Sequence, residues 1–245
     1  MDLTPIWISL KTAFVSTIIT FFIGILIAQL MNKYQGRLKG LFDSILTLPL
    51  VLPPTVVGFF LLLIFGKNGP FKTILEKLDT QIIFSWSATV LAAVVVTFPL
   101  MYRTARGAFE QIDSNVSNAA RTLGASEWTI FWKVTVPLAW PGIAAGTILS
   151  FTRALGEFGA TLMIAGNIPG KTQTIPVAIF FAAEGGEMDK ALMWVLLIVG
   201  ISFTVIILMN YWSEYQGKYL SKKRGKNYGV ISWHRKGPSR FYFKS

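Results

Sequence analysis

Two ionisable residues stand inside a long apolar segment of this sequence, and they are the first candidates for a chemical role. Arg153 and Glu157 are four positions apart, so on a helix they share one face. Charges in such a segment are costly and usually face the interior of a helix bundle or a water-filled cavity. The pair therefore predicts either an internal ion pair that locks the helix or a polar site along a passage. Sequence alone leaves both open.

A second candidate is a phosphate-binding loop at residues 166–172, which read Gly-Asn-Ile-Pro-Gly-Lys-Thr. The segment has one residue too few between its glycines for a P-loop, and it follows an apolar helix instead of a strand. Pro176 also interrupts the long helix whose N-terminus would hold the phosphate. The sequence therefore predicts that this chain does not bind ATP.

Composition excludes several other chemistries. The chain has no cysteine and a single histidine, His234, in a polar tail, which argues against a thiolate site, a histidine metal site and a catalytic triad. No catalytic residue, metal or cofactor is predicted. The net charge of +11 suggests either nucleic acid or cytoplasmic loops of a membrane protein. We favour loops and no nucleic acid, because the basic residues flank apolar segments.

The elements that must position these residues are membrane helices. Hydrophobic residues make up 53% of the chain and charged residues only 14%, against about 25% in soluble proteins. Long apolar runs without strand alternation predict an all-α integral membrane protein with about five transmembrane helices. Pro49, Pro53 and Pro54 predict a kink in the second. The expected spans are 6–31, 41–65, 85–108, 137–165 and 188–212.

The distribution of Lys and Arg predicts the orientation. Basic residues follow the first, third and fifth spans, which places the N-terminus outside and the C-terminus inside. Residues 172–184 predict a short helix at the outer surface or a re-entrant cap. The expected division is a transmembrane domain over 1–220 and a basic, loop-like cytoplasmic tail over 221–245, which binds the membrane surface or is simply solvated.

A polar segment at about 110–137 lies on the predicted cytoplasmic side. Asp113 or Ser114 can cap a helix, Gly124 can end it in the left-handed conformation, and Ser126 can start a second helix with a bulky aromatic face. Pro137 marks the expected entry into the fourth span. The helix–glycine–helix element is interpreted either as a docking surface or as a plain surface helix.

This segment resembles the EAA loop of ABC importer permeases. Ala119 and Ala120, three residues, Gly124, and then Val-Thr-Val before Pro137 follow that pattern, whereas Asn118 stands where the family usually has Glu. Residues 47–58, 153–161 and 166–176 are similar to the molybdate-type permeases, and the resemblance covers about residues 5–215.

The resemblance implies a type I ABC importer permease, a multi-pass protein of the cell membrane with a cytoplasmic coupling helix. It would pair with itself as a homodimer and dock two copies of an ABC ATPase subunit, which hydrolyses the ATP. An extracytoplasmic oxyanion-binding protein would deliver molybdate or tungstate. Sulfate or another oxyanion is the alternative. An autonomous secondary transporter, which predicts internal repeats, and a non-transporting scaffold are further alternatives.

Two sets of site residues are expected, the first from the resemblance and the second from polar residues in and beside the fourth span. The ATPase-docking set is Asn118, Ala119, Ala120, Arg121, Gly124 and Pro137. The translocation pathway would use Arg153, which gives positive potential for a divalent anion, and Glu157, with Thr152, Thr161 and Asn167 as polar liners. Glycines of the fourth span predict close packing, either within the chain or at a homodimer seam.

Overall fold

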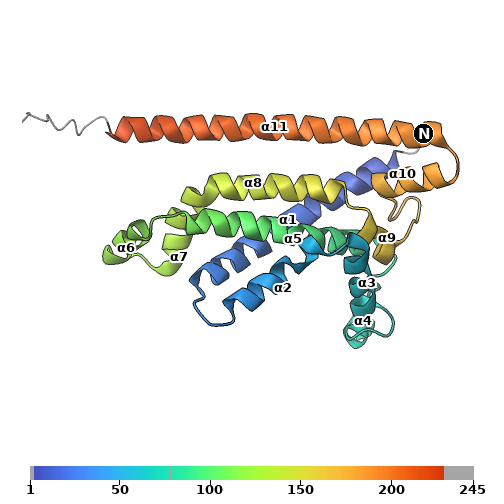
Figure 1. The fold of residues 1–245 in the computed structure, drawn as a ribbon, viewed down its shortest axis with the longest axis horizontal. Coiled ribbons are helices and arrows are strands. Elements are labelled where there is room, and N and C mark those ends of the chain that lie inside the picture. The colour runs from blue at the N-terminus through green and yellow to red at the C-terminus, as the bar shows by residue number, and fades with distance from the viewer. Residues whose placement is uncertain (1–2, 78, 229–245) are drawn as a thin grey trace, which may run out of the picture.

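The computed structural model describes residues 3–77 and 79–228, and these residues form helices joined by short loops (Figure 1). The helices are α1 (Thr4–Lys33), α2 (Lys39–Val51), α3 (Pro54–Phe65), α4 (Lys72–Lys77), α5 (Trp86–Glu110), α6 (Ser114–Thr122), α7 (Glu127–Ile130), a π-helix (Phe131–Thr135), α8 (Val136–Leu155), α9 (Gly159–Ala165), α10 (Ile175–Glu184) and α11 (Met188–Tyr228).

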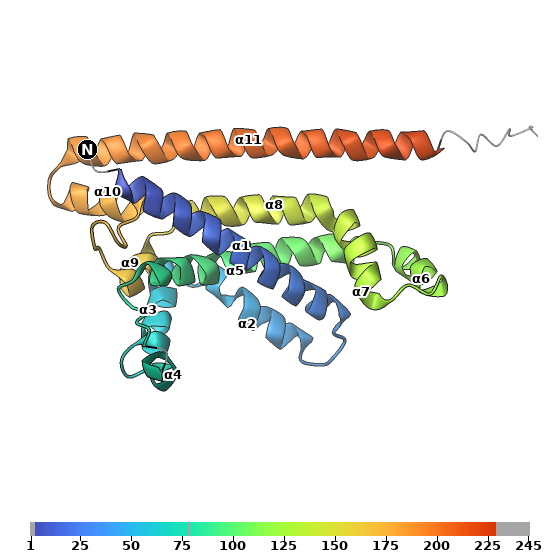
Figure 2. The ribbon, with the colours of Figure 1, turned by 180° about the vertical axis from the view of Figure 1, so that it is seen from behind.

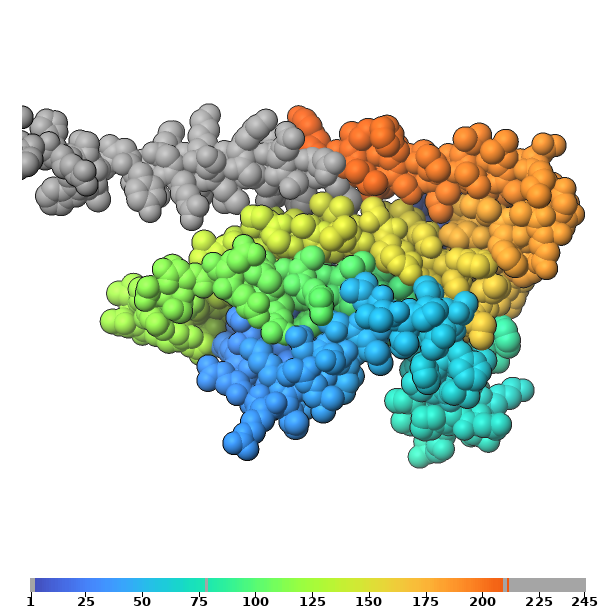
Figure 3. Space-filling model, viewed as in Figure 1, coloured from blue at the N-terminus to red at the C-terminus, as the bar shows by residue number. Residues whose placement is uncertain are grey.

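The centre of the molecule is a bundle of α1, α5 and α8, which pack against one another. Figures 1 and 2 show α6 and α7 at one end of this bundle and α9 and α10 at the other, with α11 along one side. In the space-filling view, α3 and α4 project from the bundle as a separate arm (Figure 3). The predicted docking segment and the predicted Arg–Glu site therefore lie at opposite ends.

The predicted all-α membrane fold is confirmed. Within the described residues, four helices are long and apolar enough to cross a membrane: Thr4–Lys33, Trp86–Glu110, Glu127–Leu155 and Met188–Leu208. The bent pair α2 and α3 is a fifth if it counts as one span. Four or five crossings agree with the expected number of about five.

Hydroxyl and small residues hold α1 against α5. The hydroxyls of Thr12 and Thr89 lie 2.9 Å apart, and those of Thr20 and Thr97 lie 3.3 Å apart two turns further along. All four threonines are buried. Helices in lipid gain little from apolar contact alone, so close packing and interhelical hydrogen bonds of this kind carry much of their association.

The expected kink in the second span is a break. Helices α2 and α3 meet at an angle of 113°, because Pro53 and Pro54 both lack the N–H that would continue the helix. Pro49, by contrast, sits inside α2 without ending it. Helix α3 turns away and packs on α9, where a Cβ added at Gly58 would lie 2.8 Å from the Cα of Ala160.

The predicted fourth span, 137–165, is wrong at both ends. The helix starts earlier, at Glu127, and Pro137 lies inside it, because a π-helical turn bonds the N–H of Val136 to the carbonyl of Phe131 just before the proline. The helix then stops at Leu155. The chain bends through Gly156 to Phe158 and restarts as the short helix α9.

The two remaining surface segments also differ in outcome. Residues 175–184 form the expected short helix, α10, which packs on α11 and is tied to α1 by the N–H of Ile175 donating to the Ser9 hydroxyl at 2.8 Å. The predicted loop-like tail is wrong for residues 221–228, where the backbone of α11 stays helical to Tyr228. Residues 229–245, including His234, lie outside the described part.

Close packing of α8 on α5 explains one glycine and gives a stability prediction. A Cβ at Gly142 would lie 2.5 Å from the Cβ of Ala108, which cannot rotate away, so the helices would have to separate. Overpacking costs about 1–3 kcal/mol. We therefore expect Gly142→Ala to lower the unfolding temperature of the detergent-solubilised protein.

The matched control is Gly107→Ala on α5, where an added Cβ meets nothing within 4 Å. This variant should be neutral or slightly stabilised, because alanine is about 1 kcal/mol better than glycine in a helix. Equal melting of the two variants would show that the α5–α8 contact at Gly142 is not tight.

Candidate functional site

The end of the bundle formed by α6 and α7 is a helix–turn–helix whose two helices both have side-chain caps. The Asp113 carboxylate accepts from the N–H of Asn115 at 2.9 Å and caps α6, and the Ser126 hydroxyl accepts from the N–H of Thr129 at 3.3 Å and caps α7. Both caps were expected from the sequence. They define the direction in which each helix leaves the turn.

Gly124 makes the turn between the two helices. Its φ of 80° is in the left-handed region, as predicted. The N–H of Gly124 donates to the carbonyl of Arg121 at 2.9 Å, and the N–H of Ala125 donates to that of Ala120 at 3.1 Å. This pair of bonds is a Schellman motif, which satisfies carbonyls that the end of α6 would otherwise leave open.

A cluster of charges stabilises the turn from outside. Glu127 accepts from Arg121 at 2.6 Å and from Lys33, at the end of α1, at 2.7 Å. Arg121 also donates to the Asn118 side-chain oxygen at 2.8 Å. Hydrogen bonding to Glu127 raises the pKa of the Arg121 guanidinium.

The sequence reasoning missed the part of Glu127 and Lys33 in this cluster. Opposite charges on the two sides of a glycine turn were the available signal for the bond between Arg121 and Glu127. The partner Lys33 is 94 positions from Glu127 in the chain, so no local pattern could indicate it.

The outer face of this element is exposed and partly apolar. No residue of α6 is buried, Leu123 is 87% exposed and Trp128 is 69% exposed. Ala119 is exposed and Ala120 is half-buried. Exposed apolar side chains gathered at one end of a molecule usually mark a surface that another protein covers.

Aromatic rings fasten α7 to the bundle beneath that face. Phe131 is buried, with its ring centroid 6.2 Å from that of Phe109 on α5 and 5.0 Å from that of Trp132. Trp128 in turn lies 5.7 Å from Trp132. These rings therefore join the segment that follows α6 to the end of α5.

At the opposite end, Arg153 and Glu157 form an ion pair at the break between α8 and α9. Arg153 Nη1 lies 2.7 Å from Glu157 Oε2, and the other carboxylate oxygen accepts from the N–H of Ala160 at 2.8 Å. The Glu157 side chain is 1% exposed, whereas that of Arg153 is 34% exposed. The carboxylate is thus enclosed, and the guanidinium reaches the surface.

The other predicted pathway residues are Thr152, Thr161 and Asn167. Thr152 donates to the carbonyl of Ile148 at 3.0 Å, within its own helix. Thr161 is fully buried on α9. Asn167 accepts from the side-chain amide of Gln173 at 2.9 Å. The structure therefore brings Arg153 and Glu157 into contact, and the lining of a pathway by the other three residues stays a prediction.

Comparison with known proteins defines the class. Residues 20–215 match the family model described as the binding-protein-dependent transport system inner membrane component, and the chain belongs to that family. This assignment agrees with the multi-pass helical fold and with an exposed element at one end of the bundle.

Two relatives within this family are named for molybdenum transport. The chain is 42% identical to ModB of Escherichia coli (strain K12), a molybdenum transport system permease protein, over 89% of this chain and 95% of that one. It is 46% identical to YvgM of Bacillus subtilis (strain 168), a candidate molybdenum transport permease, over 84% and 91% of the two chains.

A solved structure supports the fold. A bacterial ABC transporter involved in the import of the acidic polysaccharide alginate superposes with a TM-score of 0.72, covering 88% of this chain and 80% of its own, at 16% identity. The predicted ABC importer permease fold is therefore confirmed.

Proposed function

We propose that this chain is the membrane-spanning permease subunit of an ATP-driven importer that carries molybdate into the cell. The observation that carries this proposal is the 42% identity, over 89% of the chain, to a protein named for molybdenum transport. Tungstate is a second cargo with the same tetrahedral shape and charge.

The energy for transport comes from a partner in this proposal. Two copies of the chain form the pathway and dock two copies of an ABC ATPase subunit on the α6–α7 elements, through Asn118, Ala119, Ala120, Arg121 and Gly124. ATP binding closes the ATPase dimer, draws the docking elements together and opens the pathway to the outside. The exposed apolar face of this element supports the docking role.

The proposed location is the cytoplasmic membrane, with the α6–α7 end inside. The contact between Lys33 and Glu127 supports this orientation, because it brings the basic end of α1 to the same end of the bundle as the docking element. The opposite end, with α9 and α10, then faces an extracytoplasmic binding protein that delivers the oxyanion.

Arg153 is the residue we assign to the anion. Its guanidinium is partly exposed at the outer half of the bundle and would supply positive potential to a divalent oxyanion. Glu157 holds it in place from the buried side. Thr152, Thr161 and Asn167 are proposed to line the pathway after the helices rearrange.

Sulfate is the main alternative cargo, because it shares the shape and charge of molybdate. An autonomous secondary transporter and a scaffold are disfavoured by membership of a binding-protein-dependent transport family.

Reconstitution tests the proposal. The chain is placed in proteoliposomes with a candidate ABC ATPase and a candidate oxyanion-binding protein. Uptake of labelled molybdate is followed with ATP on the side of the membrane where the ATPase is bound. We expect uptake that needs ATP and both partners. Uptake without any ATPase would contradict the proposal, and uptake of sulfate in preference to molybdate would favour the alternative cargo.

A further inference from the structure

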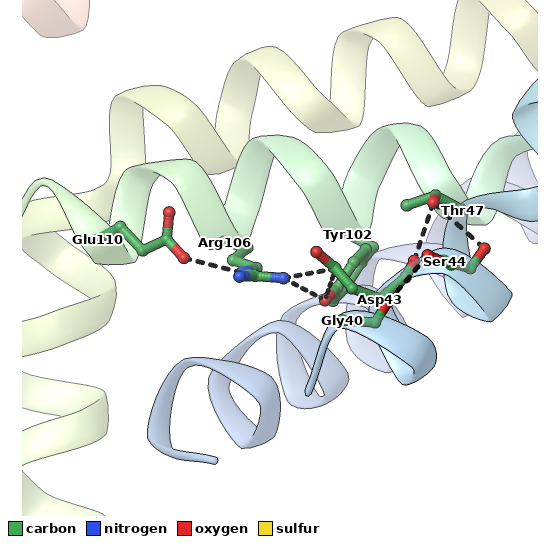
Figure 4. Close-up of polar contacts among 7 residues, drawn as sticks. All are labelled: Gly40, Asp43, Ser44, Thr47, Tyr102, Arg106 and Glu110. Atoms are coloured by element: carbon green, nitrogen blue, oxygen red, sulfur yellow. Dashed lines mark hydrogen bonds and ion pairs between the residues drawn. The ribbon is translucent and has the colours of Figure 1, made fainter. Parts of the chain in front are cut away.

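A cluster of polar side chains joins α2 to α5 away from both sites described above. The Tyr102 hydroxyl donates to Asp43 Oδ1 at 2.6 Å, and Arg106 Nη1 forms an ion pair with the same carboxylate oxygen (Figure 4). Arg106 also donates to the Tyr102 hydroxyl at 3.0 Å and, through Nε, to Glu110 at 2.8 Å. One carboxylate on α2 is thus held by two donors on α5.

This cluster is a main attachment of α2 to the bundle. Among the residues of α2, only Thr47 is buried, so apolar packing holds this helix weakly. Tyr102 is completely buried, and the Arg106 side chain is 17% exposed. A charge-assisted pair in a partly enclosed place is stronger and more directional than an exposed one.

The cluster also lies next to the docking element. Arg106 is one turn before the end of α5, and its partner Glu110 is the last residue of that helix. Only residues 111–113 separate Glu110 from the start of α6. The same end of α5 is packed, through Phe109 and Phe131, against the π-helix that directly follows α7. The short connection and the aromatic contact therefore couple the position of the docking element to the position of Arg106.

On its other side, α2 leads towards the ion pair at the far end. The chain passes from α2 through the break at Pro53 into α3, and α3 packs on α9. The contact is close, because an added Cβ at Gly58 would lie 2.8 Å from Ala160. The N–H of Ala160 is bonded to Glu157, the partner of Arg153. A continuous series of contacts, from α5 through α2 and α3 to α9, therefore connects the docking element to the Arg153–Glu157 pair.

We propose that Asp43 and Arg106 are positioning residues that make α2 move together with the docking end of α5, and so carry the movement of the α6–α7 element to α3, α9 and the Arg153–Glu157 pair. This inference rests on the proposed function. The two donors, Tyr102 and Arg106, bond the same carboxylate and so set the angle and the register between α2 and α5. Apolar packing alone would not set them, because α2 is only weakly buried.

The test removes the charge of Asp43 with little change in shape. In the reconstituted complex, Asp43→Asn should lower the molybdate taken up per ATP hydrolysed by about tenfold, which is within the range of mutations that alter coupling between sites. ATP hydrolysis and copurification of the ATPase should stay near those of the unmodified protein. Asp43→Glu, which keeps the carboxylate, should recover part of the loss.

The matched control is Glu76→Gln, which breaks the exposed pair between Lys72 and Glu76 on α4, outside the proposed route. It should leave the ratio of uptake to hydrolysis unchanged. Arg106→Gln also loses the bonds to Tyr102 and Glu110, so it should be the more impaired single variant. A double variant, Asp43→Asn with Arg106→Gln, should be no worse than Arg106→Gln, because both changes remove the contact between Asp43 and Arg106.

A distance measurement tests the α2–α5 contact directly, whereas the uptake-to-hydrolysis ratio with the ATPase still bound is the readout that a purely structural role would not move. The chain has no native cysteine, so spin labels can be placed on cysteines introduced at Ser44 on α2 and Gln111 at the end of α5. Dilution of labelled chain with excess unlabelled chain restricts the measured distance to one copy. We expect one narrow distance that stays constant when ATP is added, and a broadened distribution in the Asp43→Asn protein.

Several results would overturn the inference. These are an unchanged uptake-to-hydrolysis ratio in Asp43→Asn, an equal fall of uptake and hydrolysis, or a label distance insensitive to the substitution. Failure of the unmodified complex to take up molybdate would instead contradict the proposed function, and the label distance would still test the α2–α5 contact.

Discussion

Replacing Gly124 with valine is expected to separate ATP hydrolysis from transport. The φ of 80° at this position is strongly disfavoured for a β-branched residue. An added Cβ meets nothing within 4 Å, so the effect comes from backbone strain and not from a clash. The left-handed conformation costs roughly 1–2 kcal/mol for an L-residue, and the turn can relieve it only by changing the angle between α6 and α7.

The measurement is ATP hydrolysis and molybdate uptake in the same proteoliposomes. We expect hydrolysis to continue and uptake to fall at least about tenfold, which corresponds to 1.4 kcal/mol. Ala120 enlarged to tryptophan should have a similar effect, because Ala120 is half-buried at the surface where a partner would approach.

Gly186→Val is the matched control for Gly124→Val. Gly186 has a φ of 77° and no neighbour within 4 Å of an added Cβ, but it lies between α10 and α11 at the opposite end. The same strain there should leave the coupling of hydrolysis to uptake intact. Unchanged coupling in both the Gly124 and Ala120 variants would reduce the α6–α7 element to an ordinary surface structure.

Replacing Arg153 with alanine is expected to abolish most uptake while the ATPase still copurifies with the chain. The substitution removes the proposed positive charge of the pathway. It also leaves the Glu157 carboxylate, 1% exposed, without its counter-charge. Removing one partner of a buried pair costs about 3–5 kcal/mol, so loss of uptake by this variant alone does not separate a role in transport from a role in folding.

Two companion variants separate these roles. Arg153→Lys keeps the positive charge and should retain part of the uptake. The double variant Arg153→Gln with Glu157→Gln removes both charges and leaves no unpaired carboxylate, so a purely structural pair predicts recovery of uptake. If Arg153 serves the anion, the double variant stays inactive although it assembles. Normal uptake by a well-assembled Arg153→Ala protein would contradict the assignment.

Local sequence determined much of the docking element. The caps at Asp113 and Ser126 and the left-handed turn at Gly124 depend on contacts within five residues, so residue type alone indicates them. The lengths of the apolar segments likewise predict membrane helices, because a bilayer demands about 20 apolar residues whatever the fold. The places of the segments 110–137 and 153–157 in the chain were also predictable, because both are polar residues next to or within long apolar segments.

The geometry of the two broken spans was not predictable. Prolines 49, 53 and 54 all lack an N–H, yet the helix breaks only at the adjacent pair, and α3 beyond the break packs on α9. The fourth span ends at Leu155, where Glu157 turns its carboxylate back to bond Arg153 and the N–H of Ala160. Which helix covers the freed backbone groups depends on tertiary packing.

What the sequence alone determined is therefore the all-helical membrane class, the capped helix–glycine–helix element and the spacing of Arg153 and Glu157 on one face. The tertiary structure alone decided the contacts between distant segments, such as Lys33 with Glu127 and Asp43 with Arg106. The physical reason is the separation along the chain of the residues that interact. Caps, turns and helix faces arise from neighbours along the chain, whereas a charge pair between helices exists only after packing has placed both side chains within hydrogen-bonding distance.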